Sequence, residues 1–268
     1  MKIGLCQMNT QDKKARNLEA AETAIDKLAA QGADLVVLPE MFHFLGPDEE
    51  KPANAEPIPG PSIDRLQRKA KEKKIYLHCG SILEKDGGKI YNTSVVFNRQ
   101  GERVAFYRKI HLFDVEIPGG IVYKESGVVT PGKDVVTFGC EGITVGLSIC
   151  YDLRFPELYR RLADKGASLI LVPAAFTLMT GKDHWEALIR ARAIENVCYV
   201  GACGQWGFHP VNNQCYGHSM IVNPWGMVIA QARDGEATVL AELDFDYMHS
   251  VREKLPSLQH RRKDIFVG

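Results

Sequence analysis

Apolar and polar residues alternate along the chain in blocks that predict an α/β protein. Residues 14–31 carry apolar side chains at helical spacing, and 157–165 is also predicted to be helical. Mostly apolar strands are expected at 3–8, 143–149 and 169–172, and 35–38 is a continuous apolar run, typical of a strand covered on both faces of a sheet. Strands and helices therefore alternate in sequence, which favours sheets covered by helices.

The order strand, helix, strand occurs twice with similar residues. Residues 3–5 and 32–39 parallel residues 145–147 and 166–173, with a predicted helix inside each pair. Two such halves predict two mixed sheets related by a pseudo-twofold axis, each with helices on its outer face. We therefore expect a four-layer α-β-β-α sandwich that forms a single domain over residues 1–268.

The remaining pattern predicts shorter elements and three loops. Helices are expected at 62–74, with Ser62 as N-cap, and at 183–196. Further strands are expected at 75–82, 90–98, 103–107, 197–202, 216–222, 227–231 and 239–243. Loops are expected at 48–61, 115–134 and 204–213. A loop as long as 115–134 usually serves a site, and 48–61 is a candidate lid.

Composition limits the partners. Of the 268 residues, 33 are Lys or Arg and 33 are Asp or Glu, so the net charge is zero. This balance argues against nucleic acid or an anionic membrane as the partner. No apolar run approaches the ~18 residues of a membrane span, and no signal-peptide pattern precedes the first strand. Seven cysteines without a CxxC motif predict reduced thiols in the cytoplasm.

Cys150 is the candidate nucleophile. It follows the apolar strand 143–149, and Pro156 suits the first position of the next helix. Free backbone N–H groups at such a junction favour a thiolate or an oxyanion. A buried structural cysteine would fit the same position, so position alone leaves both interpretations open.

A nucleophilic thiol needs a base, either a histidine or a carboxylate. The chain has eight histidines, so a Cys–His pair remains open. Glu40 directly follows an apolar run, and desolvation there would raise its pKa toward that of a useful base. The alternative is a carboxylate that caps or pairs at the start of a loop. The histidines lack metal-ligand spacing such as HExxH, so we expect neither a metal nor another cofactor.

Three motifs together resemble those of the carbon–nitrogen hydrolase (nitrilase) superfamily in order and spacing. They are Leu38-Pro39-Glu40-Met41-Phe42, Tyr107-Arg108-Lys109-Ile110-His111-Leu112-Phe113 and Cys150-Tyr151-Asp152-Leu153-Arg154-Phe155-Pro156-Glu157. The resemblance implies that Glu40 is the general base, Lys109 the cationic stabiliser and Cys150 the nucleophile. It also implies that Glu125 orients Lys109, and that Lys109 and the Tyr151 backbone N–H hold the oxyanion. Without the resemblance, Lys109 reads as a solvated strand-end charge and Glu125 as a loop carboxylate.

Tyr151 stands where nitrilases proper usually carry Trp, so the chain looks like the amidase branch. Residues 113–119, 180–186 and 216–219 are similar to omega-amidases and deaminated glutathione amidases, although Lys182 replaces a frequent proline. The resemblance implies hydrolysis of a small carboxylate-bearing amide through a cysteine thioester, with release of ammonia or an amine. The alternatives are an N-carbamoyl amino acid amidohydrolase, another aliphatic amidase, or a non-catalytic binding protein of the same fold.

The resemblance also places Arg154, Phe176 and Thr180 around the substrate. The planar guanidinium of Arg154 suits a carboxylate, although it would also suit a pair with Asp152 or Glu157, and Phe176 would also suit the core. The helix at 183–196 would suit a subunit interface, as in relatives. We therefore expect a homodimer or higher homo-oligomer that binds a small amide.

Overall fold

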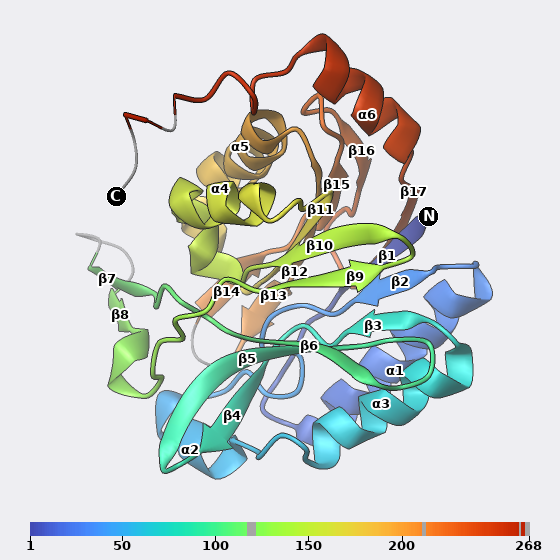
Figure 1. The fold of residues 1–268 in the computed structure, drawn as a ribbon. Helices are drawn as coiled ribbons and strands as arrows, with labels where there is room; N and C mark the ends of the chain where they lie inside the picture. The colour runs from blue at the N-terminus through green and yellow to red at the C-terminus, as the bar shows by residue number, and fades with distance from the viewer. Residues whose placement is uncertain (117–121, 211–212, 263, 266–268) are drawn as a thin grey trace.

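Two sheets pack face to face in the computed structural model, which describes residues 1–116, 122–210, 213–262 and 264–265. Helices cover the outer face of each sheet, so the molecule has four layers (Figure 1). Buried apolar side chains from both sheets, including Ile3, Leu5, Leu147 and Leu171, form the core between them. The predicted four-layer α-β-β-α sandwich of two mixed sheets is confirmed.

The first sheet has the order β17-β1-β2-β3-β5-β4, and β6 pairs with β5. Strands β1, β2 and β3 are parallel to one another, and the pairs that flank them are antiparallel. Its strands are β1 (Lys2–Gln7), β2 (Leu35–Val37), β3 (Tyr76–His78), β4 (Ile82–Asp86), β5 (Lys89–Phe97), β6 (Arg103–Arg108) and β17 (Ala237–Glu242). Helices α1 (Lys14–Ala30) and α3 (Pro61–Lys73) cover its outer face (Figure 1).

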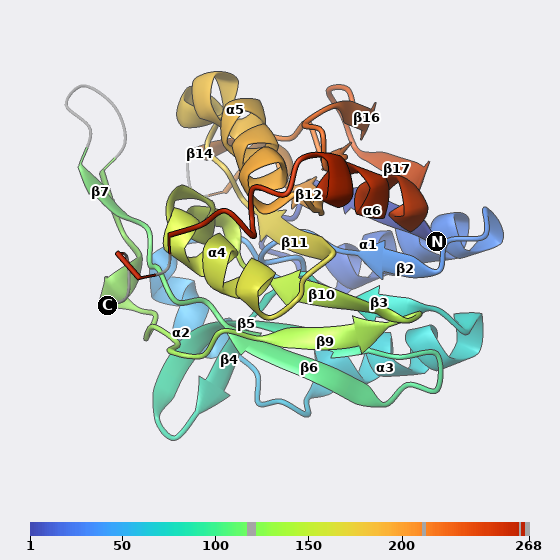
Figure 2. The same ribbon diagram turned by 45° about the horizontal axis from the view of Figure 1, so that its top comes forward.

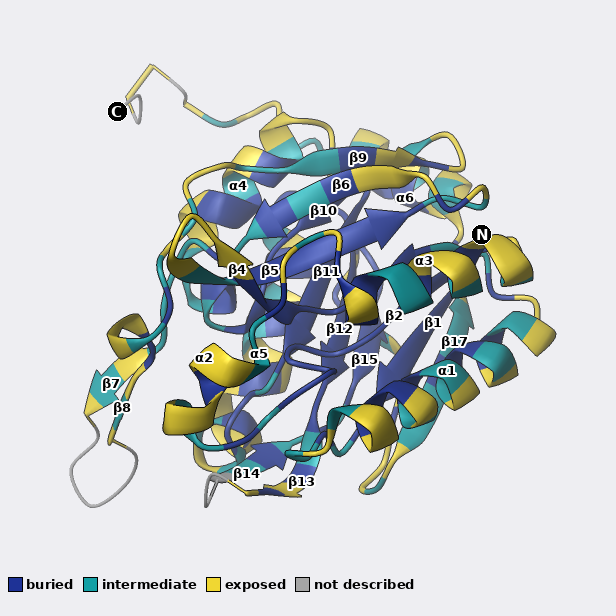
Figure 3. Cartoon of the chain, turned by 90° about the horizontal axis from the view of Figure 1, so that it is seen from below, coloured by how far each residue is buried: buried dark blue, intermediate teal, exposed yellow. Residues whose placement is uncertain are grey.

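The second sheet has the order β16-β15-β12-β11-β10-β9, with β10, β11 and β12 parallel. Its strands are β9 (Thr137–Cys140), β10 (Ile143–Leu147), β11 (Leu169–Ala174), β12 (Tyr199–Gly204), β15 (Met220–Val222) and β16 (Val228–Gln231). Helices α4 (Pro156–Asp164), α5 (Leu178–Asn196) and α6 (Phe245–Lys254) lie on its outer side (Figure 2). Figure 3 shows that the exposed residues of the helices face away from the buried strands.

Several predictions of where a strand or helix begins or ends were wrong. The predicted strand 75–82 breaks into β3 and β4 at Gly80, which has a φ of +55°. A Cβ there would lie 2.0 Å from the Pro39 carbonyl oxygen, so the chain must turn at a glycine. Ser62 is not the N-cap of α3, because Gly60 occupies that position and the Ser62 hydroxyl donates to Glu56 at 2.8 Å.

The predicted loops contain regular structure. Residues 48–61 include the short helices η1 (Asp48–Glu50) and α2 (Lys51–Asn54). Residues 204–213 were expected to be a loop, but β13 (Trp206–His209) pairs there with β14 (Asn213–Tyr216). The predicted strand 216–222 is therefore divided between β14 and β15. The region 115–134 holds most of β7 (Asp114–Glu116), together with β8 (Val122–Lys124) and η2 (Glu125–Gly127); its residues 117–121 lie outside the described part.

The remaining differences concern element ends and elements that the pattern did not predict. Helix α5 begins at Leu178 rather than at residue 183. Strand β9 and helix α6 were not predicted, and α6 is capped by Asp244, whose side chain accepts from the Tyr247 N–H at 2.9 Å. In the described part of the chain, no helix is both long and apolar enough to cross a membrane.

Candidate active site

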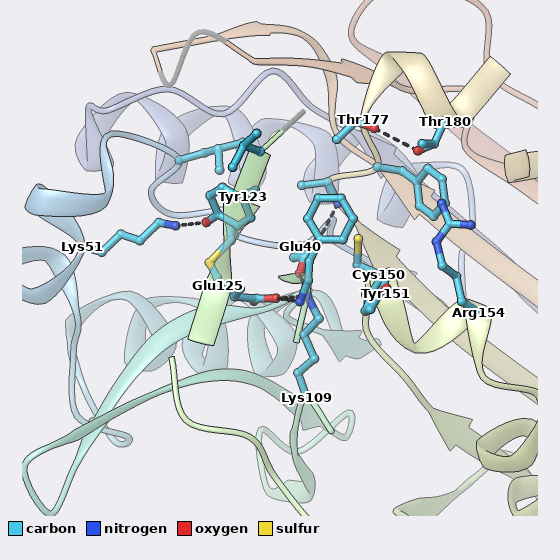
Figure 4. A pocket seen from close by; sticks show the side chains of 16 residues that line it. Glu40, Lys51, Lys109, Tyr123, Glu125, Cys150, Tyr151, Arg154, Thr177 and Thr180 are labelled. Carbon is cyan, nitrogen blue, oxygen red and sulfur yellow. Dashed lines mark hydrogen bonds and ion pairs between the residues drawn. The ribbon is translucent and has the colours of Figure 1, made fainter. Parts of the chain in front are cut away.

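Four predicted residues from separate segments face one pocket (Figure 4). Glu40 follows β2, Lys109 follows β6, Glu125 opens η2 and Cys150 follows β10. Cys150 has a φ of +46°, a backbone conformation that a non-glycine residue rarely adopts. The fold therefore brings the carboxyl ends of its strands together around a strained cysteine.

Lys109 lies between two carboxylates. Its Nζ is 3.1 Å from Glu40 Oε1 and 2.8 Å from Glu125 Oε2, and only 2% of the side chain is exposed. Burial alone would lower the pKa of this ammonium, but the charges of Glu125 and Glu40 outweigh burial and hold its pKa well above the ordinary value. Lys109 is therefore a buried cation rather than a solvated strand-end charge.

Glu40 is held at both carboxylate oxygens and at its backbone. Oε1 accepts from Asn92 Nδ2 at 2.8 Å, and Oε2 accepts from the Ala175 N–H at 2.7 Å. Gln205 Nε2 donates to the Glu40 carbonyl oxygen at 2.9 Å. These contacts fix the carboxylate beside Lys109.

Asn92 was not predicted, yet it joins the two carboxylates. Its Nδ2 donates to Glu40 and also lies 3.3 Å from Glu125 Oε1. Glu125 is further held by the Phe113 N–H, which donates to Oε2 at 2.7 Å. The one sequence signal for Asn92 is a polar residue within the predicted strand 90–98.

Cys150 is 8% exposed. Burial and the adjacent negative charge of Glu40 raise the pKa of its thiol well above the ordinary value, and the Lys109 charge opposes that rise. The thiol is therefore protonated near neutral pH. A reaction at this sulfur needs a base that takes the proton as the sulfur attacks.

Asp152 ties the cysteine turn to the segment that carries Lys109. Its Oδ2 accepts from the Ile149 N–H at 2.9 Å and the Tyr107 hydroxyl at 2.6 Å. Its Oδ1 lies 3.0 Å from the His111 backbone nitrogen and 2.7 Å from His111 Nδ1. This buried carboxylate was also not predicted as part of the site. His111 is thereby engaged with Asp152 rather than with the thiol.

The pocket has a volume of about 350 Å³, within the range of small-molecule sites. Its lining includes the predicted Tyr151, Arg154, Phe176 and Thr180, and also Lys51 and Tyr123, which were not predicted. Thr180 Oγ1 lies 2.9 Å from Thr177 Oγ1. Phe176 serves both the pocket and the core, because its ring packs 5.1 Å from that of Trp185.

Arg154 presents its guanidinium at one side of the pocket. The group lies 5.2 Å over the Phe176 ring, and its NH1 is 3.3 Å from His184 Nδ1. Among the described residues it forms no ion pair, so the expected alternatives with Asp152 and Glu157 are absent there. A guanidinium without a carboxylate partner at a pocket suits an anionic ligand.

Among the described residues, no group of three or more His, Cys, Asp or Glu side chains could hold a metal ion. All seven cysteines are free and buried. The chemistry available from these side chains is thus that of a thiol, two carboxylates and an ammonium in one enclosed pocket.

Comparisons with known proteins agree with this geometry. The chain is 43% identical to a deaminated glutathione amidase of Synechocystis over 95% of its length and 96% of the relative. It is 41% identical to the human omega-amidase NIT2 over 99% of its length and 96% of the relative. The solved C. elegans NitFhit protein superposes with a TM-score of 0.92 at 37% identity; the match covers 99% of this chain and 66% of that longer one.

The family model for carbon–nitrogen hydrolase matches residues 2–253, nearly the whole chain. The chain belongs to the carbon–nitrogen hydrolase family.

Proposed function

We propose that this enzyme hydrolyses the amide bond of a small carboxylate-bearing amide through a thioester on Cys150. The observation that carries the proposal is Lys109, buried between Glu40 and Glu125 in the pocket that Cys150 also lines. A buried cation beside a thiol and a carboxylate provides a nucleophile, a base and a stabiliser for negative charge. The names of the two curated relatives, both amidases, support an amide as the substrate.

The proposed reaction has two halves. Glu40 takes the thiol proton as the sulfur attacks the amide carbon, and the oxyanion faces the Lys109 ammonium and the Tyr151 N–H. The C–N bond then breaks, and Glu40 returns the proton to the departing ammonia or amine. Water attacks the thioester as Glu40 takes its proton, the C–S bond breaks, and the acid and the free thiol are restored. Glu125 holds Lys109 in place throughout.

Arg154 supports a carboxylate on the substrate. Its guanidinium, which has no carboxylate partner among the described residues, lines the pocket beside Phe176, and Thr180 lines the same pocket. We infer that the acyl part carries the carboxylate, as in the ω-amide of an α-keto dicarboxylic acid or the corresponding bond of deaminated glutathione. An N-carbamoyl amino acid or a simple aliphatic amide would use the same catalytic groups and remains the alternative substrate.

The test compares Cys150→Ala with Cys79→Ala, which removes another buried thiol. Ammonia or amine release is measured from α-ketoglutaramate, deaminated glutathione, a carbamoyl amino acid and a nitrile. We expect Cys150→Ala to lower turnover by at least about 10⁴-fold with an unchanged circular dichroism spectrum, and Cys79→Ala to remain active. Mass spectrometry of the trapped wild type should find acyl adducts on Cys150. Activity retained in Cys150→Ala, or no wild-type turnover of any amide, contradicts the proposal.

We also propose a single domain over residues 1–268, a cytoplasmic location and a homodimer that uses the α5 side. Seven free, buried thiols support a reducing compartment. Ile194 of α5 lies beside Gly226, and Trp225 and Met227 flank that glycine. The three apolar residues are 47%, 58% and 57% exposed, which supports an apolar contact surface there. Sedimentation should show that Ile194→Asp shifts a dimer toward monomer, and an unshifted dimer would contradict the use of this surface.

A further inference from the structure

Lys51 lines the pocket as a third cation besides Lys109 and Arg154, and the catalytic scheme does not use it. It is the first residue of α2, and 6% of its side chain is exposed. Its Nζ lies 2.5 Å from Asp48 Oδ1 and donates to the Tyr123 hydroxyl. Burial by itself lowers the pKa of this ammonium, but Tyr123 and Asp48 outweigh burial and raise it, so Lys51 remains charged.

The position of Lys51 relative to Arg154 defines two sides of the pocket. In Figure 4, Lys51 and Tyr123 lie on the Glu125 side of Lys109, and Arg154 lies on the opposite side, beyond Cys150. Tyr123 comes two residues before Glu125, so the same short segment carries a Lys51 partner and a Lys109 partner. A substrate carbon that reacts with the Cys150 sulfur beside Lys109 would therefore lie between Lys51 and Arg154.

The chemistry of the reaction assigns these two sides. If Arg154 holds the acyl part, the leaving group must point away from it, toward Glu125, Tyr123 and Lys51. An ammonium has three N–H donors, and Lys51 directs two of them to Asp48 and Tyr123. The described residues supply no acceptor for the third. Asp48 is 43% exposed, so solvent screens its charge more than that of buried Lys51.

We propose that Lys51 binds a carboxylate on the leaving group and so favours amides whose departing amine is anionic over primary amides. This inference rests on the proposed amide hydrolysis and names its substrate class. The favoured substrate carries one carboxylate on the acyl side, at Arg154, and a second on the amine side, at Lys51. Loss of ammonia from a primary amide would leave the Lys51 contact unused.

Two substrates that differ by one charge test this inference. One is deaminated glutathione, whose leaving group ends in a carboxylate, and the other is the same compound with a C-terminal carboxamide. The measured quantity is the ratio of their kcat/KM values. We expect Lys51→Met to lower this ratio at least tenfold, mainly through KM of the acid, and Lys51→Arg to restore most of it. Lys124→Met, which removes an exposed cation next to Tyr123, is the control and should keep the wild-type ratio.

The ratio separates recognition from a purely structural role. Both substrates meet the same enzyme sample, so a misfolded fraction affects both values equally and cancels. A Lys51→Met ratio within twofold of wild type would overturn the inference, including the case in which both values fall together because Lys51 only anchors α2. If wild type cleaves neither compound nor any primary amide, the proposed function itself fails.

Discussion

The two strand–helix–strand halves of this fold share a backbone and differ in chemistry. In the first half Ile3 pairs with Leu35, and in the second Val145 pairs with Leu169 at the equivalent register. Each first strand has a glycine under its helix: a Cβ on Gly4 would lie 2.8 Å from Leu28 of α1, and a Cβ on Gly146 would lie 3.1 Å from Leu162 of α4. The scaffold is thus repeated down to one close helix–strand contact.

The halves diverge where their strands end. The first strand of the first half leads to Met8, and that of the second half leads to Cys150 at the equivalent position. The second strands lead to Glu40 in the first half and Ala174 in the second. One half therefore supplies the proposed base and the other the proposed nucleophile. The comparison teaches that a repeated scaffold can divide one reaction between its two copies.

Each half also fixes its contribution with a buried network centred two residues past the equivalent positions Met8 and Cys150. In the second half Asp152 accepts from Ile149, Tyr107 and His111. In the first half the equivalent Thr10 donates to the Phe42 carbonyl and accepts from Gln205, whose amide also donates to the Glu40 carbonyl. A charged network holds the cysteine turn, and a neutral one holds the glutamate turn.

The largest expected effect comes from removing the Glu40 carboxylate, which the first half contributes to the site. Glu40→Gln should lower kcat for amide hydrolysis by about 10³- to 10⁴-fold, because no base then takes the thiol proton. The same change should lower the pKa of Cys150, because the negative charge of Glu40 raises it and Lys109 remains. The pH midpoint for iodoacetamide labelling of Cys150 should therefore move to lower pH.

A lower kcat together with a thiol that is labelled at lower pH distinguishes a base beside the thiol from a structural carboxylate. Glu56→Gln removes another buried glutamate of the same half, held by Lys14 and Ser62, and should leave the labelling midpoint in place. A Glu40→Gln enzyme that loses turnover while the midpoint rises or stays fixed would show that Glu40 does not face the thiol as a charge.

The sequence predicts the strand–helix–strand scaffold that the two halves share better than it predicts the buried hydrogen-bond networks. Apolar runs and the repeated Gly-Ala motif at 32–33 and 166–167 predict both halves, because buried parallel strands are apolar on both faces. Strand ends predict where Glu40 and Cys150 meet. Lys109 and Glu125 follow from the family resemblance, because neither has a local pattern that separates it from a surface charge.

The roles of Asn92, Asp152 and Gln205 could not be predicted, because the partners that tie them to the site are distant in sequence. Asn92 bonds Glu40 across 52 positions, and Gln205 bonds the same residue across 165. Strand β9 and the β13–β14 ribbon were missed for another reason: each pairs with the strand next to it in sequence, but neither carries a long apolar run. Helix α6 has a recognisable N-cap in Asp244, and that signal could have located its start.

The next largest effect should come from the charged network. Asp152→Asn keeps the shape of the side chain but replaces one carboxylate oxygen with an NH₂ group. The protein groups that donate to that oxygen would then face another donor. We expect a loss of about 3 kcal/mol in the free energy of unfolding and lower kcat. Thr10→Val in the first half removes a neutral hydroxyl and should cost about 1 kcal/mol. Denaturant unfolding measures both, and equal losses would remove the proposed contrast between the networks.

A smaller effect should come from the paired glycines. Gly4→Ala and Gly146→Ala each push a methyl group into the helix above, which should cost about 1–3 kcal/mol, with the larger cost at Gly4. Only Gly146 lies on the strand that leads to Cys150, so only Gly146→Ala should also lower kcat beyond the folding loss. Thermal melts and steady-state rates test this, and equal kcat for the two variants would contradict it.

The smallest expected effect is a difference between the two halves in how much stability they lose at low pH. His43 and His78 are buried in the first half, and burial lowers the pKa of each to about 3. Where the first half has His78 on its third strand, the second has Gly201. Because these folded-state pKa values lie below the ordinary 6.5, the stabilising contribution is complete above that pH and is lost as pH falls toward 3.

We expect each histidine to remove roughly 1 kcal/mol per pH unit in that window. Hydrogen exchange at pH 5 should therefore rise more, relative to pH 7, in β2 and β3 than in β11 and β12. His78→Gln, which keeps a polar side chain that cannot charge, should reduce this difference even if it lowers stability at every pH. Equal acid sensitivity in both halves, or an unchanged difference in His78→Gln, would show that the buried histidines do not set it.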